Sequence, residues 1–178
     1  MALTPSTMMP IGTRAPDFEL PDTVSGKTVK LSDFAKKKAL LVMFICNHCP
    51  YVIHVRDGLV KLGKDYETKD VAIVAISAND PRTHPDDAPD KLGAESKRLG
   101  YRFPVLFDES QDVAKAYRAA CTPDFFLFDE KQKLVYRGQF DGSRPGNNVL
   151  VTGSDLRSAI EAVLAGKPLA KEQKPSLG

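Results

Sequence analysis

Apolar residues along the chain form short continuous runs and one stripe with helical spacing. Residues 39–45 and 71–76 are apolar throughout, which predicts two strands buried on both faces. Between these runs, apolar residues recur three and four positions apart at Val52, Val55, Leu59, Leu62 and Tyr66. The stripe predicts a helix with Pro50 in its first turn, where a missing N–H is tolerated. Strand, helix and strand together form a β-α-β unit with parallel strands.

Shorter patterns on both sides of this unit predict the rest of the fold. Two alternating stretches flank a turn-rich segment and indicate an N-terminal β-hairpin at 18–20 and 29–31. Further strands are predicted at 105–107, 125–128 and 134–136, with helices at 90–99, 111–119 and 154–166. Residues 79–89 contain three prolines and are predicted to be a polar loop, neither helix nor strand. The order predicts an α/β fold in which a mixed central β-sheet is flanked by helices.

The length of 178 residues suits one domain with a hydrophobic core. We expect a flexible N-terminal arm at 1–13, the domain at 14–166 and a polar C-terminal tail at 167–178. Nothing resembles a secretory signal, and the longest apolar run is too short to span a bilayer. These features predict a cytoplasmic protein.

The charge balance argues against two classes of partner. The formal net charge is +2, with acidic and basic residues interleaved. We therefore expect neither nucleic acid nor a membrane as a partner. The chain has 3 cysteines, and two of them, Cys46 and Cys49, are close in sequence. In a reducing compartment, such a pair indicates redox or metal chemistry rather than a permanent disulfide.

Cys46 falls where a predicted buried strand ends and a helix begins. Unpaired N–H groups and the helix dipole stabilise an anion at that place, and the thiolate is the nucleophile. We assign Cys46 the attack on a partner disulfide and Cys49 the resolution of the mixed disulfide. Two alternatives stay open at this point: a pair of inert buried thiols, or a copper or zinc site that adds His48 or His54.

Two further features bear on the redox role of the cysteine pair. Protonated His48 would favour the Cys46 thiolate and make the disulfide more oxidising, unless it is only a surface residue. Cys121, Thr122 and Pro123 precede a predicted strand, where a proline is tolerated. A cis bond before Pro123 would expose the Thr122 backbone to an incoming peptide, whereas a trans bond would make Pro123 an ordinary strand-initiating residue.

Motifs along nearly the whole chain resemble one superfamily. They lie at 12–18, 31–34, 44–52, 75–80, 107–109, 116–117, 121–129 and 136–138. These segments are similar to the thioredoxin-like superfamily, in its alkyl-hydroperoxide-reductase/thiol-specific-antioxidant (redoxin) branch, and most to a peroxiredoxin-like group with a thioredoxin-type Cys-x-x-Cys. The resemblance implies a thioredoxin fold with Pro123 as a cis-proline facing the cysteine pair, and with Cys121 near Cys46.

The resemblance also ranks the possible activities. True peroxiredoxins carry Pro-x-x-x-Thr-x-x-Cys-Pro, and aligning Cys49-Pro50 with its end puts Val42 and Cys46 where Pro and Thr belong. Arg118 lies near the family's peroxide-binding arginine, but its spacing to the next strand differs. We therefore expect a thiol–disulfide oxidoreductase first, and a thiol peroxidase using Cys49 or Cys46 second. The partners would be protein or small-molecule thiols and disulfides and a thiol reductant, with no bound cofactor or metal.

Overall fold

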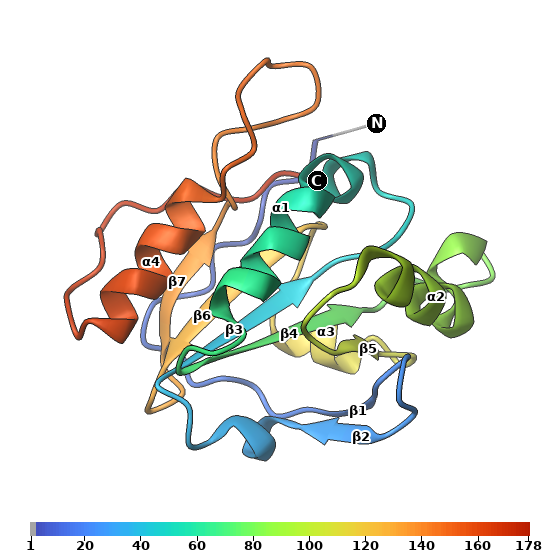
Figure 1. Ribbon diagram of the computed structural model, residues 1–178, viewed down its shortest axis with the longest axis horizontal. Coiled ribbons are helices and arrows are strands. Elements are labelled where there is room, and N and C mark those ends of the chain that lie inside the picture. Colours follow the sequence, from blue (N-terminus) through green and yellow to red (C-terminus); the bar gives the residue numbers. More distant parts are fainter. Residues whose placement is uncertain (1–2) are drawn as a thin grey trace.

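The computed structural model describes residues 3–178 and is built on a five-stranded sheet (Figure 1). The strand order is β5-β4-β3-β6-β7. The strands are β3 Ala39–Phe44, β4 Val71–Ser77, β5 Val105–Phe107, β6 Asp124–Asp129 and β7 Leu134–Gly138. β3, β4 and β5 are parallel, whereas β6 runs antiparallel to both β3 and β7. The predicted mixed sheet and the predicted β-α-β unit are therefore confirmed.

Helices cover both faces of this sheet, which explains the continuous apolar runs in its central strands. On one face, α1 (Pro50–Tyr66) and α4 (Ser154–Leu164) pack against alternate residues of β3, such as Leu41 and Met43. On the other face, the remaining β3 residues meet Val113 and Tyr117, in and just after α3. Figure 1 shows α1 and α4 in front of the sheet and α3 behind it.

A small antiparallel hairpin extends the second face, as predicted. It consists of β1 (Glu19–Pro21) and β2 (Thr28–Lys30), followed by the 3-10 helix η1 (Leu31–Phe34). Its apolar residues join the same buried cluster as α3. The hairpin is tied to the sheet edge, because the Thr23 N–H and hydroxyl both donate to the carbonyl of Val105.

Two predicted elements differ from the structure. The helix expected at 111–119 is only α3, Asp112–Ala116, because Gln111 and Arg118 take left-handed backbone angles of φ 65° and 53° on either side. The segment 79–89 was expected to be irregular throughout, but it contains the 3-10 helix η2 (Pro85–Asp87). Pro85 is tolerated there because it stands at the start of the turn. Helix α2 (Pro89–Leu99) follows and ends, as predicted, at Gly100.

The two ends of the described chain pair with each other. Thr4 and Gly178 exchange both backbone hydrogen bonds, at 2.9 and 3.1 Å, and Pro5 bridges to Leu177. Ser176 is buried, and its hydroxyl donates to the Gly138 carbonyl at the end of β7. In Figure 1 both ends lie near the first turn of α1. No helix within residues 3–178 combines the length and the apolar character needed to cross a membrane.

Candidate active site

The two predicted cysteines lie between the end of β3 and the start of α1. Cys46 comes two residues after β3, and Cys49 is the N-cap of α1, with φ −68° and ψ 123°. Pro50 explains this boundary: a proline disfavours helical angles in the residue before it and is itself suited to the first helical position. Both thiols are buried, with 3% exposure for Cys46 and 9% for Cys49.

The loop before β6 lies against both sulfurs. The peptide bond between Thr122 and Pro123 is cis, as the resemblance implies. Cys46 Sγ lies 3.4 Å from the Thr122 hydroxyl. Cys49 Sγ lies 3.2 Å from the Thr122 carbonyl oxygen, to which the protonated thiol can donate. The fold therefore brings Cys46 and Cys49 against Thr122 and Pro123, which follow them by more than 70 residues in the sequence.

The surroundings of the two thiols favour ionisation of Cys49. A hydrogen bond from the Cys46 thiol lowers the pKa of Cys49 to about 5, and Thr122 and two N–H groups of the first turn of α1 act in the same direction, against burial. The same thiol–thiol hydrogen bond raises the pKa of Cys46 far above its usual range, with burial and the Asp87 carboxylate adding to the effect. The two thiols are thus coupled, and the directions of the two pKa shifts favour negative charge on the Cys49 side of the pair.

The directions of these pKa shifts run against the expectation that the Cys46 thiol loses its proton more easily. That expectation stays a prediction, since the Thr122 hydroxyl faces Cys46 and the Thr122 carbonyl oxygen faces Cys49. The prediction placed the start of the helix directly after Cys46, so that the free N–H groups of the first turn would point to its sulfur. In the structure α1 begins at Pro50, and these N–H groups lie at Cys49 instead. Cys46 receives one N–H, from Cys49 itself.

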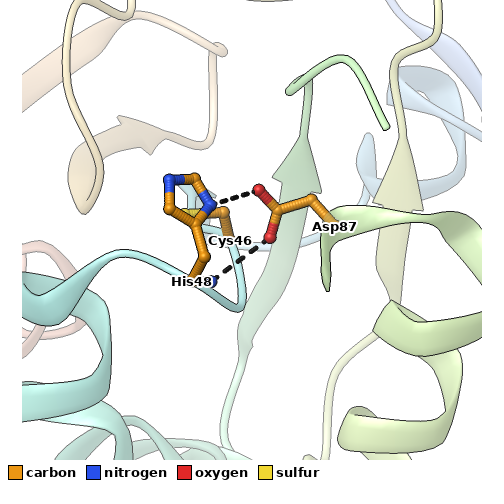
Figure 2. Close-up of side chains that lie close together, drawn as sticks. All are labelled: Cys46, His48 and Asp87. Carbon is orange, nitrogen blue, oxygen red and sulfur yellow. Dashed lines mark hydrogen bonds and ion pairs between the residues drawn. The ribbon is translucent and has the colours of Figure 1, made fainter. Parts of the chain in front are cut away.

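Asp87 is the site residue that sequence reasoning missed. Its carboxylate is fully buried and accepts backbone N–H donors from Asn47 at 2.7 Å and His48 at 3.3 Å. It also accepts the Asn79 amide at 2.8 Å. Figure 2 shows the carboxylate paired with His48 Nδ1, at 2.5 Å. The carboxylate thus holds the loop between the two cysteines in place.

His48 is placed by this contact. Its ring pairs with Asp87 and stacks on the ring of His84, with centroids 4.3 Å apart. His48 was predicted to favour the Cys46 thiolate. Asp87 lies beside both residues, and its carboxylate acts on Cys46 in the opposite direction by raising the pKa of that thiol.

Cys121 and His54 have different surroundings. Cys121 is half-buried and lies next to the site, with its Sγ 3.8 Å from the Pro123 carbonyl. Burial raises its pKa to about 12, so it stays a thiol. His54 contacts the Ser143 hydroxyl at 2.7 Å, in the loop before α4.

Among residues 3–178, the donors that lie close enough together to hold a metal do not include His54. Within residues 3–178, the group of donors close enough for a metal is Cys46, His48 and Asp87, within 4.8 Å of one another. The Asp87 oxygens already accept four N–H donors, from Asn47, His48 and Asn79. A metal would have to displace some of them, so this group fits a metal poorly.

The sheet order, the Cys-x-x-Cys at the start of α1 and the facing cis-proline define a thioredoxin-fold protein. A thiol:disulfide interchange protein of the thioredoxin family from Chlorobium tepidum shows the same fold, with a TM-score of 0.67, 18% identity, and coverage of 88% of this chain and 99% of that one. The chain belongs to the AhpC/TSA family, which matches residues 11–137.

Two further proteins are similar to this chain over most of its length. The thiol-disulfide oxidoreductase ResA of Geobacillus thermodenitrificans is 28% identical over 135 residues, which are 74% of this chain and 70% of that protein. The crystal structure of an uncharacterized conserved protein from Geobacillus kaustophilus superposes with a TM-score of 0.98 and 49% identity, covering 100% of this chain and 94% of that one.

Proposed function

We propose that this protein is a thiol–disulfide oxidoreductase whose Cys46 and Cys49 alternate between a dithiol and a disulfide. The observation that carries the proposal is the pair of thiols at the start of α1, with both sulfurs against Thr122 of the cis-proline loop, at 3.4 and 3.2 Å. A thiolate next to a second thiol is the arrangement that thiol–disulfide exchange requires. The substrates are thiols and disulfides, as for the similar ResA.

The geometry supports Cys49 as the attacking residue. Cys49 is the less buried residue of the two, 9% exposed against 3% for Cys46, and it lines an open cavity whose described lining does not include Cys46. The Cys49 thiolate attacks one sulfur of the substrate disulfide, a mixed disulfide forms, and the other substrate sulfur leaves as a thiolate. Cys46 then loses its proton and attacks Cys49 Sγ, which forms the Cys46–Cys49 disulfide and releases the second thiolate.

Two electrons thus pass from the protein to the substrate in one cycle. A thiol reductant returns the Cys46–Cys49 disulfide to the dithiol by the same exchange in reverse. Run in the opposite direction, the disulfide form oxidises a partner dithiol.

Peroxide reduction is the second candidate function, and one observation favours it. Arg118 lines the same cavity as Cys49, so a cation is available near the thiolate. The position of the family's threonine is held by Cys46, however, whose thiol is a weak donor. Peroxide oxygens would therefore lack a hydroxyl donor at the point where charge develops.

Trapping of the mixed disulfide tests the order of attack. In a Cys121→Ser background, Cys46→Ala should retain attack on 5,5′-dithiobis(2-nitrobenzoic acid) and keep one thionitrobenzoate bound, because nothing resolves the mixed disulfide. Cys49→Ala should react far more slowly. The assay is run at pH 8.5, since loss of the Cys46 thiol removes a hydrogen bond to the Cys49 thiolate. Fast, stable labelling of Cys49→Ala instead would assign the attack to Cys46.

We also propose a cytoplasmic location. It is supported by the cysteine content, since two of the three cysteines are placed for reversible chemistry rather than for a permanent disulfide. Fractionation of cells that express the full native gene, with activity followed in each fraction, checks this proposal.

A further inference from the structure

The backbone that a peptide substrate would use is covered in this protein. Gly178 lies so close to Thr122 that a Cβ on it would be 2.3 Å from the Thr122 carbonyl oxygen and 2.9 Å from its nitrogen. Residues 4–6 pair with 176–178 beside this contact and hold Gly178 there. Strand addition needs a free backbone edge. The site therefore offers no such edge to a peptide at Thr122, contrary to what the cis-proline alone suggested.

One approach to Cys49 stays open. A cavity of about 580 Å³ is lined by Cys49 and Thr122 on one side and by α3 and the segment after it on the other. Its volume lies in the range of pockets that hold small molecules. This volume suits a small disulfide at Cys49.

The charged side chains that line this cavity have one sign. Lys115 and Arg118 are exposed at its rim, and His48 and His84 lie nearer to Cys49. Among the described residues that line it, none is aspartate or glutamate, although the chain contains 23 acidic residues. Lys115 has only a loose exposed contact of 3.8 Å with Asp112. The Arg118 backbone is fixed, because its carbonyl accepts the Thr7 hydroxyl at 2.8 Å.

We propose that the substrate is a small disulfide that carries carboxylates, bound in this cavity with its carboxylates toward Lys115 and Arg118 and one sulfur at Cys49. This inference rests on the proposed function. The two protein thiols and one substrate disulfide yield the Cys46–Cys49 disulfide and two small thiols. Two electrons and two protons pass to the substrate, and a dithiol reductant resets the protein.

Three probes of different charge test the inference with fully reduced protein in single turnovers, so that no reductant is needed. They are oxidised glutathione, which is anionic, bis(2-hydroxyethyl) disulfide, which is neutral, and cystamine, which is cationic. Each rate constant is divided by that of dithiothreitol with the same disulfide, which removes differences in intrinsic reactivity. We expect the order anionic, neutral, cationic, with the anionic probe slowed by added salt.

A matched pair of double variants assigns the effect to the cavity. Lys115→Gln with Arg118→Gln should lower the normalised rate with oxidised glutathione about fivefold, the effect of losing two exposed ion pairs, and leave the neutral probe unchanged. Lys36→Gln with Lys37→Gln changes the net charge equally, at the opposite end of β3 from the cysteines, and should leave all three rates unchanged.

The outcomes separate this inference from the proposed function. If wild-type protein reduces none of the three probes and forms no Cys46–Cys49 disulfide, the proposed function fails. If it reduces all three without an order of charge, or if both double variants slow the anionic probe equally, the oxidoreductase stands and the carboxylate-binding cavity is wrong.

Discussion

At the scale of single residues, the ionisation of Cys49 is the property that makes the site reactive. We predict that alkylation of reduced Cys121→Ser protein by iodoacetamide follows a titration with a midpoint near pH 5, the value to which the pKa of Cys49 is lowered. Cys46→Ala removes the largest cause of that shift, so the midpoint should move upward toward that of an ordinary thiol. Equal midpoints in both proteins would mean that the thiol–thiol hydrogen bond has no such effect.

His48 and Asp87 are predicted to set the redox potential in opposite directions. The Asp87 carboxylate disfavours negative charge on the coupled cysteine pair, through Cys46, and His48 pairs with that carboxylate. His48→Ala should leave that charge unpaired and make the potential more negative, on the order of 30 mV, or about 1.4 kcal/mol for two electrons. Asp87→Asn should shift it the other way. We expect a wild-type potential less negative than that of thioredoxin, at about −270 mV.

Titration in glutathione buffers measures these potentials. Identical values for wild type and His48→Ala, within error, would show that solvent screens the histidine. An Asp87→Asn value that is more negative than wild type would contradict the role given to the carboxylate.

The sequence predicts some of these residues and not others, for a physical reason. Cys46 and Cys49 are found from their spacing and from the strand-to-helix boundary around them. Asp87 lies 40 residues after Asn47, its backbone partner, in a segment whose prolines only indicated a loop. No local pattern signals such a contact, because it exists only once η2 has been placed against the loop between the cysteines.

At the scale of elements, β6 carries a buried carboxyl group next to the site. Burial raises the pKa of Asp124 from 3.8 to about 8, so the folded protein holds a proton there that the unfolded chain loses above about pH 4. The folded state therefore binds more protons between pH 4 and 8, and this group makes stability fall as pH rises through that window, by at most about 1.4 kcal/mol per pH unit.

Asp124→Asn is predicted to flatten that dependence and to be more stable than wild type at pH 8. Urea unfolding at pH 5, 6, 7 and 8 measures the free energy of unfolding of both proteins. Asp70→Asn, at an exposed position, serves as the control and should keep the wild-type slope. An Asp124→Asn variant that loses stability at pH 8 would show that the ionised carboxylate is accommodated.

The elements themselves follow largely from hydrophobic pattern. The runs that became β3 and β4 are apolar because both of their faces are covered, and the stripe of α1 faces the sheet. The pattern fails at α3, where nine residues were predicted to be helical and five are. The left-handed backbone angles of Gln111 and Arg118 limit α3 on its two sides, and neither residue type predicts such an angle from the sequence.

At the scale of the whole molecule, residues 4–6 and 176–178 pair beside the site and place Gly178 against the Thr122 backbone. Deletion of residues 176–178 removes Gly178 from the Thr122 backbone and frees that edge. We predict that reduction of insulin in the presence of dithiothreitol is slow for the full chain and several-fold faster for the shortened one. Circular dichroism confirms that the shortened chain is folded. Equal insulin rates in both proteins would mean that the chain ends do not limit access.

The pairing of the ends could not be predicted from composition. Residues 1–13 show no regular hydrophobic pattern, residues 167–178 are polar, and each segment contains two prolines, which is typical of loose ends. Their contacts depend on residues 170 positions apart, such as Ser6 and Ser176, and on the close approach that Gly178 alone permits. A glycine in a polar tail carries no signal of that approach until the cis-proline loop is in place.

The central claim is that Cys46 and Cys49 form a reversible disulfide, and peptide mapping after a redox titration tests it most directly. Protein equilibrated in glutathione buffers is quenched with acid, alkylated, digested and analysed by mass spectrometry. We predict one two-electron transition, an intramolecular Cys46–Cys49 disulfide in the oxidised protein, free Cys121 throughout, and full reversal by dithiothreitol. Free thiols at every potential, or disulfides only between molecules or to Cys121, would contradict the account.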